Sequence, residues 1–271
     1  MPNTYDLSFI DQFNEEAKLA YQQTESLLSN VVRRHKATGA THTFQKLGKA
    51  TVAQKARNGD IPVQDLTHTK VTATLGDWYS STLIDSLDEL KTNIDWRKEY
   101  LMTQKSAINR KLDSIIITAA LSGTNTVTTT AGGWTYAKHL EAVTKLGLAD
   151  VPAEDRYMVV TQYQLSEMMN EVKVISSDYT GGLEPITSGK IGNLMGFKVI
   201  VVADEVLPKV TGVRTVFYYN RQAVGLAVGL EPTSTIKEIA HKDAFQITAK
   251  LSVGAVLIDG LGVVEMPCTE V

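Results

Sequence analysis

The chain has 271 residues, which is enough to bury a sizeable core in one large domain or two interlocked ones. Hydrophobic residues make up 43% and charged residues 21%, a composition that excludes an intrinsically disordered chain and does not indicate a membrane protein. The 27 basic and 30 acidic residues give a formal charge of -3, so the net charge provides no general attraction for nucleic acid.

The first residues lack both the basic segment and the apolar segment of an export signal, so we expect none. No apolar run approaches the ~20 residues needed to span a bilayer. The single cysteine, Cys268, cannot form an intrachain disulfide and fits a reducing compartment. We therefore expect synthesis in the cytoplasm without export and no membrane association.

The N-terminal third predicts an arm followed by a hairpin. From Leu7 to Arg34 apolar residues recur mostly at helical spacing, which predicts an amphipathic helix or arm that ends at Thr38-Gly39. Residues 40–80 predict a long two-stranded excursion with too few large apolar residues to form a core of its own. With roughly 17 residues in each extended arm it would reach about 50 Å, so we expect it to need a partner surface.

The middle of the chain predicts helices around a buried strand. The strongest helical pattern runs from Asn93 to Leu121, where Ser122-Gly123 ends it, and it predicts a rod roughly 40 Å long. Three more elements follow, namely a helix over Thr135–Leu146, a buried strand over Arg156–Thr161 and a helix over Gln162–Val172.

A long polar loop over Ser176–Gly192 then leads into strands. Loops of this length in a compact chain are usually functional or mobile. The predicted strands are Phe197–Val202, Thr215–Tyr219, Ala223–Val228, Thr235–Ala240, Phe245–Ser252 and Gly254–Asp259. This order of elements predicts an α+β protein rather than a doubly wound one.

Three blocks resemble one family in the order that the family has them. The first is Ser81–Asp88 followed by Asp95-Trp96-Arg97 and the long helix. The second is Arg156–Val160 with the polar loop and the glycine-punctuated step Gly192-Asn-Leu-Met-Gly-Phe197, and the third is Phe217–Val228. The closing segment Phe245–Ala255 is similar to the family's return strand. Together these segments resemble the major capsid proteins of tailed bacteriophages with the Hong Kong 97 fold.

The resemblance implies an α+β capsid fold with an N-terminal arm, an extended β-hairpin loop, a long spine helix, a peripheral domain and an axial domain. The implied segments are 1–37 for the arm, 38–80 for the loop, 81–134 for the spine helix and peripheral domain, 135–232 for the axial domain, and 233–271 for the peripheral return. It implies a major capsid protein that self-assembles into the icosahedral shell around phage double-stranded DNA, without sequence-specific DNA binding. The shell would be a virion component assembled in the cytoplasm of the bacterial host.

The implied partners are copies of the chain arranged as pentamers and hexamers. Separate scaffold, portal and decoration proteins are further partners that the family allows. Some relatives join a loop lysine to an asparagine of a neighbour, but no residue context here identifies that asparagine. The candidate intersubunit contacts are Lys46, Lys49, Lys55, Arg57, Asp60, Trp78, Asp178 and Tyr179.

We find no pattern of catalytic, cofactor-binding or metal-binding residues. Gly189-Lys190 lacks the glycine and the Ser or Thr of a phosphate loop, and Ile191 stands where the hydroxyl is required. Glu238 and His241 have the spacing of a metal-binding pair, but the pair occurs once and in a strand-rich region. Asp85, Asp88 and Glu89 are more simply explained as charges at a helix start. We expect no enzyme activity, no cofactor and no metal.

Two alternatives remain open from the sequence. One is an encapsulin-type compartment, which has the same fold but holds an enzyme cargo. The other is a soluble α+β hydrolase with an unrecognised site.

Overall fold

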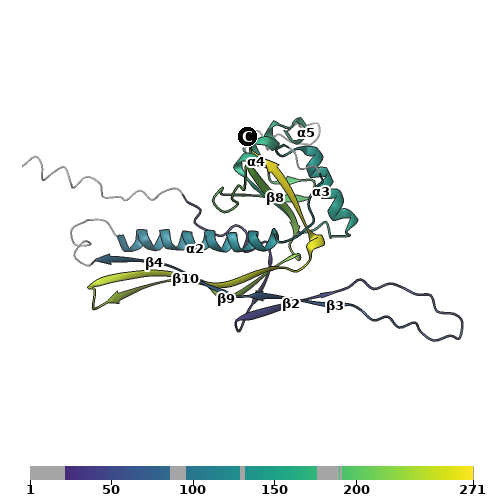
Figure 1. Ribbon diagram of the computed structural model, residues 1–271, viewed down its shortest axis with the longest axis horizontal. Helices are drawn as coiled ribbons and strands as arrows, with labels where there is room; N and C mark the ends of the chain where they lie inside the picture. The colour runs from purple at the N-terminus through teal and green to yellow at the C-terminus, as the bar shows by residue number, and fades with distance from the viewer. Residues whose placement is uncertain (1–21, 86–95, 129–131, 176–188, 190, 271) are drawn as a thin grey trace, which may run out of the picture. The chain divides into compact units, whose positions relative to one another are not determined.

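The computed structural model describes residues 22–85, 96–128, 132–175, 189 and 191–270 (Figure 1). Within it the chain divides into two compact units. The first unit holds the described residues up to Ser26, Gly76–Leu112 and Leu230–Ser252. The second holds Leu27–Leu75, Asp113–Gly229 and Val253–Val271.

Helix α2 (Trp96–Ala120) has 25 residues and confirms the predicted rod, with a length of about 37 Å at ~1.5 Å per residue. In the first unit it contacts strand β4 (Gly76–Asp85) through polar side chains. Ser80 donates a hydrogen bond to the side-chain amide of Gln104, which in turn donates one to Thr82. On the other face of β4, Ser81 and Thr248 exchange a hydrogen bond of 3.0 Å. Strand β4 therefore carries hydrogen-bonded polar side chains on both faces, beside the buried Ile84.

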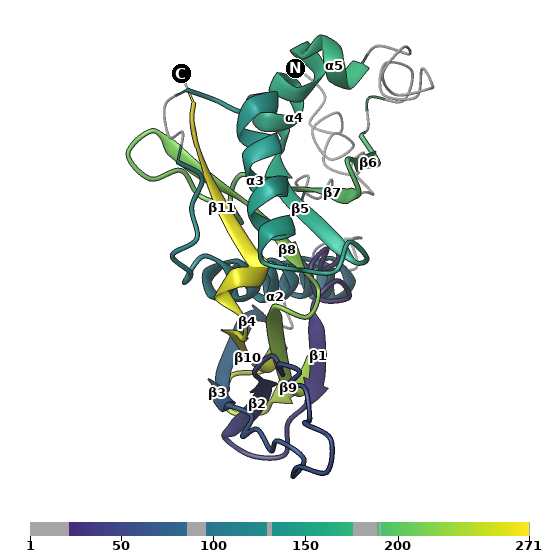
Figure 2. The same cartoon turned by 90° about the vertical axis from the view of Figure 1, so that its right-hand side faces the viewer.

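The second unit contains a five-stranded sheet in the order β11-β8-β5-β7-β6 (Figure 2). Its strands are β5 (Arg156–Thr161), β6 (Asn193–Leu194), β7 (Phe197–Val202), β8 (Val213–Asn220) and β11 (Val263–Thr269). The helices of this unit are α3 (Tyr136–Leu148), α4 (Gln162–Asn170) and α5 (Val172–Ile175). Every residue of β5 is buried, as its uninterrupted apolar run predicts, because β5 lies between β7 and β8 and α4 packs against it.

Helix α3 packs against β11 in Figure 2. It begins where the side chain of Thr135 accepts a hydrogen bond from the backbone N–H of Lys138, a side-chain cap of the kind that serine and threonine form. Its apolar residues join those of the sheet in one core that includes Ala142, Leu146, Met158 and Phe197.

Two further sets of strands complete the fold. Strands β1 (Arg33–Lys36), β9 (Val224–Ile239), β10 (Ala244–Leu257) and β4 form a sheet in the order β1-β9-β10-β4. Strands β2 (Thr41–Leu47) and β3 (His68–Thr74) form an antiparallel pair, as expected for the hairpin. A short 3-10 helix, η2 (Gly260–Gly262), leads into β11.

The base of the hairpin is held by a small core of its own. Phe44 on β2 and Ala73 on β3 are buried with Ala37, Ala227 and Ile258. A Cβ atom added to Gly225 would lie 2.8 Å from Cζ of Phe44, so only glycine lets the phenyl ring approach β9 this closely. The hairpin therefore begins from a packed base.

The expectation of a helix through Arg34 is wrong for residues 22–34. Described residues 22–32 form bends and turns, and β1 follows from Arg33 as a strand that pairs in parallel with Gly225–Val228. Polar side chains of α2 bind this segment: Asn109 donates to the carbonyl of Thr24, and Asp113 accepts from the backbone N–H groups of Leu27 and Leu28. These contacts satisfy backbone groups that would otherwise be hydrogen-bonded within a helix. Residues 1–21 lie outside the described residues.

Several strands also differ from the predictions. The two strands predicted on either side of Gly229–Ser234 are one strand, β9, and the two predicted around Val253 are one strand, β10. Strands β4 and β11 were not predicted, and Asp85 is the last residue of β4. Asp88 and Glu89 lie outside the described residues. The hairpin ladder is seven residues long on each side, shorter than the extended arms expected.

The glycine-punctuated step into Phe197 is a tight hairpin between β6 and β7. Met195 and Gly196 form its turn with φ angles of 48° and 83°, a left-handed pair that suits a two-residue hairpin. The prediction of a turn that leads into a core strand is confirmed. Most of the polar loop before it, 176–188 and 190, lies outside the described residues.

Candidate functional site

The segment Gly48–Thr67 extends beyond the paired ends of β2 and β3 (Figure 1). Its apolar side chains find no cover in the described part of the chain: Val52 is fully exposed, Val63 is 89% exposed and Ile61 is 73% exposed. Isolated exposed apolar residues are common on protein surfaces, but a run of them on a projecting segment indicates a contact surface.

Local hydrogen bonds give this segment its shape. The side chain of Gln64 accepts hydrogen bonds from the backbone N–H and the hydroxyl of Thr51, at 3.1 and 2.9 Å. A turn at the tip brings the N–H of Gly59 to 3.1 Å from the carbonyl of Ala56, with Asn58 in the left-handed region at φ 64°. The segment therefore has a defined turn and internal hydrogen bonds but no hydrophobic core.

Two of the predicted contact residues at the hairpin root bind carboxylates of their own chain. Lys46 lies 2.7 Å from Asp259, and Lys49 lies 2.6 Å from Asp150. The Lys49 ammonium donates a hydrogen bond to Asp150 and thereby lowers the pKa of that carboxyl group. A cavity of about 570 Å³ opens between the root and the segments that supply these carboxylates.

The other predicted contact residues fall in different places. Lys55, Arg57 and Asp60 are exposed around the tip, and no ion pair is found for them within the described ranges. Trp78 lies on β4, where the ammonium group of Lys111 is 4.0 Å from the centre of its ring and the side chain remains 38% exposed. Asp178 and Tyr179 lie outside the described residues.

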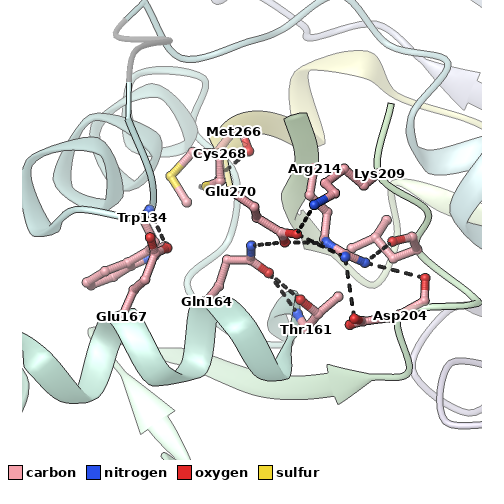
Figure 3. A network of polar contacts seen from close by, with 11 residues as sticks. Trp134, Thr161, Gln164, Glu167, Asp204, Lys209, Arg214, Met266, Cys268 and Glu270 are labelled. Atoms are coloured by element: carbon pink, nitrogen blue, oxygen red, sulfur yellow. Dashed lines mark hydrogen bonds and ion pairs between the residues drawn. The ribbon is translucent and has the colours of Figure 1, made fainter. Parts of the chain in front are cut away.

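A buried ion-pair network, which the sequence did not predict, joins the end of the chain to two other segments (Figure 3). Glu270 accepts hydrogen bonds from Nε and Nη2 of Arg214 and from the side-chain amide of Gln164. Arg214 also donates to the carbonyl oxygen of Leu207 and lies 3.5 Å from the carboxylate of Asp204. The hydrogen bond with Arg214 lowers the pKa of Glu270.

This network holds the loop between β7 and β8 in place. The loop ends in a two-residue turn at Thr211-Gly212, with φ angles of 51° and 80°, where Val210 and Val213 exchange both backbone hydrogen bonds. The carbonyl of Gly212 also accepts the N–H of Glu270, and Val210 is 69% exposed beside the turn. The network thus fixes an exposed turn at one end of the sheet.

The polar residues that most resemble an active site are enclosed in the core. The hydroxyl group of Tyr218 lies 3.0 Å from Nδ1 of His139 and 3.2 Å from Nε1 of Trp134. Burial lowers the pKa of His139 to about 4 and raises the pKa of the neighbouring Cys268 thiol to about 12. A neutral imidazole and a protonated thiol without access to solvent stabilise packing and are poorly suited to nucleophilic chemistry.

Metal-binding and membrane-spanning features were searched in the described ranges. No group of three or more His, Cys, Asp or Glu side chains there is arranged to hold a metal ion. Glu238 lies near the end of β9, and His241 follows it in a turn. No helix in the described part of the chain combines the length and apolarity needed to cross a membrane.

Comparison with known proteins places the chain in a family. The family model described as phage capsid protein matches residues 6–270. No curated protein is similar enough in sequence to count as a match.

The fold is shared with solved phage structures. A structure from Mycobacterium phage Che8 is 16% identical, with a TM-score of 0.75 over 92% of this chain and 94% of its own. The capsid structure of cyanophage P-SCSP1u is 14% identical, with a TM-score of 0.76 over 96% of this chain and 92% of its own. The head structure of Helicobacter pylori bacteriophage KHP40 is 14% identical, with a TM-score of 0.72 over 94% of each chain. The fold is therefore of the Hong Kong 97 type.

These findings do not favour the cargo-compartment and hydrolase alternatives. Because the family match spans nearly the whole chain, the chain belongs to the phage capsid protein family and is a major capsid protein that forms the shell of a bacteriophage.

Proposed function

We propose that the segment Gly48–Thr67 of each subunit lies on a neighbouring copy and joins subunits in the shell. The observation that supports this most is the exposure of Val52, Ile61 and Val63, which no described part of the same chain covers. Burying the three side chains would gain roughly 1.5 to 3 kcal/mol each. The charged tip residues Lys55, Arg57 and Asp60 would then lie at the rim of the contact.

We further propose that the subunits form pentamers and hexamers with the parts that the fold implies. Residues 1–37 serve as the arm, 38–80 as the extended loop and 135–232 as the axial domain, whose loop with Asp178 and Tyr179 faces the local symmetry axis. Residues 81–134 and 233–271 serve as the spine and the peripheral domain. Complementary rather than self-complementary contacts of this kind can close into a shell.

The shell would enclose double-stranded DNA without sequence-specific binding, which agrees with the near-neutral charge of the chain. Assembly would take place in the cytoplasm of the bacterial host, with scaffold, portal and decoration functions supplied by separate proteins.

Electron microscopy of the purified full chain tests the hairpin contact. Wild-type protein is expected to form closed particles, tubes or polyheads, and the triple variant Val52→Ser, Ile61→Ser, Val63→Ser is expected to remain as small oligomers. Gln54→Ser changes an exposed polar side chain in the same segment and should assemble like wild type.

Circular dichroism separates a lost contact from a lost fold. Because the side chains of Val52, Ile61 and Val63 are exposed, the triple variant should melt within a few degrees of unassembled wild type. If the triple variant forms particles as efficiently as wild type, the hairpin does not make the proposed contact.

A further inference from the structure

The rings of His35 and His42 lie side by side where β1 meets the base of the hairpin. Their centroids are 5.4 Å apart and their planes differ by 18°. Phe44 meets both rings edge-on, with centroids 5.6 Å from His35 and 4.8 Å from His42. The guanidinium carbon of Arg33 lies 5.9 Å from the centre of the same phenyl ring. Two imidazoles and one permanent cation thus surround a single aromatic side chain.

In the described part of the chain, the strand residues paired with this cluster are uncharged. On β3 the residues paired with His42 and Phe44 are Ala73 and Val71, and on β9 the residues paired with β1 are Gly225 to Val228. The charged groups beside the cluster are Arg33, whose guanidinium contacts the Phe44 ring, and Lys46, two residues after Phe44 on β2, with its ion-pair partner Asp259.

The negative charge of Asp259 is already paired with Lys46, which weakens its effect on the rings. Besides the ion pair with Lys46 it accepts a hydrogen bond of 3.1 Å from the N–H of Leu261. The sequence between Glu25 and Asp60 contains no carboxylate side chain at all. Protonation of both histidines therefore gathers like charges at the base of the hairpin.

We propose that His35 and His42 form an acid-sensitive clasp, which holds β1 against the hairpin base at neutral pH and loosens when both rings are protonated. Histidine side chains gain their charge between about pH 8 and pH 5. Two charges about 5 Å apart at a partly exposed site repel each other, and the repulsion weakens when salt screens it.

The loosening acts on Phe44, which both rings contact and which belongs to the small core of the hairpin base. The segment Gly48–Thr67 continues directly from this base, so its orientation depends on the state of the clasp. The clasp lies within one subunit and can be tested before any shell forms, whether or not the hairpin makes the proposed contact between subunits.

Hydrogen–deuterium exchange of the unassembled full chain tests the clasp. Protection factors of amides in β2 and β3 are compared at pH 7.5 and pH 5.5, each corrected for the intrinsic exchange rate. Wild type is expected to lose protection about fivefold between the two values. His35→Gln and His42→Gln, each tested alone, should reduce this loss to less than twofold, and 0.5 M NaCl should reduce it in wild type.

Matched variants identify the responsible group. His68→Gln and His241→Gln alter histidines outside the cluster and should behave like wild type. If the pH-dependent loss persists in both clasp variants, or if Asp259→Asn alone abolishes it, then the histidine pair is not the sensor. A wild-type hairpin base whose protection is the same at both pH values would also overturn the proposal.

Discussion

Glu270 binds Arg214 through two hydrogen bonds, 2.5 Å from Nε and 3.1 Å from Nη2, and each side chain is only 5% exposed. A buried pair of this kind is costly to break from one side, because the remaining charge keeps its desolvation penalty and loses its partner. The pair joins the end of β11 to β8 and, through Gln164, to α4.

Removing the charge of Glu270 should therefore destabilise the second unit. We expect Glu270→Gln to lower the free energy of unfolding at pH 7 by about 3 kcal/mol. Urea denaturation of the unassembled subunit measures this change. Lys209→Gln changes a more exposed partner at 3.7 Å and should cost less than about 1 kcal/mol, so equal effects of the two variants would contradict the assigned roles.

The contribution of Glu270 should depend on pH in a defined direction. Its native pKa lies below the ordinary glutamate value near 4.5, chiefly because Arg214 donates to the charged form. The unfolded chain therefore takes up the proton first as the pH falls. The stability difference between wild type and Glu270→Gln should be complete above pH 5 and shrink as the pH falls through the lowered native pKa. A difference that grows below pH 4.5 would contradict this sign.

Two glycine substitutions should change stability in opposite directions. In Gly225→Ala the new methyl group would lie 2.8 Å from Phe44 and 2.9 Å from Ile258, and overpacking of this kind costs about 1 to 3 kcal/mol. Gly147 lies in α3, and no heavy atom comes within 4 Å of the position that a methyl group would take there. Gly147→Ala should therefore stabilise the chain by about 0.5 to 1 kcal/mol. Thermal melting of both variants against wild type measures the two signs.

Asp113 should control the path of the N-terminal segment. Its carboxylate accepts the N–H groups of Leu27 and Leu28 at 3.1 and 3.2 Å, and the residue is fully buried. Asp113→Ala should cost about 1 to 3 kcal/mol because both donors lose their partner. Limited proteolysis should then cut residues 22–32 faster than in wild type, whereas Asp85→Ala, an exposed change at the end of β4, should leave that rate unchanged.

His139 should make the core of the second unit sensitive to acid. Burial lowers its native pKa from 6.5 to about 4, so the unfolded chain binds the proton more tightly than the native one. Stability should fall as the pH decreases from 6.5 to 4, by roughly 3 kcal/mol in total. In His139→Gln the slope of unfolding free energy against pH should be smaller in this window, by an amount that corresponds to nearly one bound proton. An unchanged slope would show that His139 is not responsible for the loss of stability in acid.

The apolar pattern was a sound guide where an element is apolar along one face, as in α3, or throughout, as in β5. Strand β5 and helix α3 follow that rule, and their bounds agree with the predictions to within two residues. Strand β4 does not, because its inward residues Ser80 and Thr82 bind the amide of Gln104 instead of an apolar core. With Ile84 as its only core residue, β4 shows too little apolar alternation to be predicted as a strand.

Proline lies where β11 was missed and where β9 was predicted as two separate strands. Pro267 lies inside β11, where a missing N–H is tolerated because β11 is at the edge of its sheet. Pro232 lies inside β9, beyond the four residues that β1 pairs with.

The ion pairs of the candidate site could not be predicted from the sequence. Lys46 and Asp259 are far apart in the chain, as are Arg214 and Glu270, and neither pair forms a local pattern.

The ion pair between Lys46 and Asp259 has a consequence for how this capsid protein can change over time. Because both partners belong to one chain, a substitution at either position can be compensated inside the same subunit, and every copy in a shell acquires both changes together. A charge change at Lys46 can thus be matched by one at Asp259 within the same gene product.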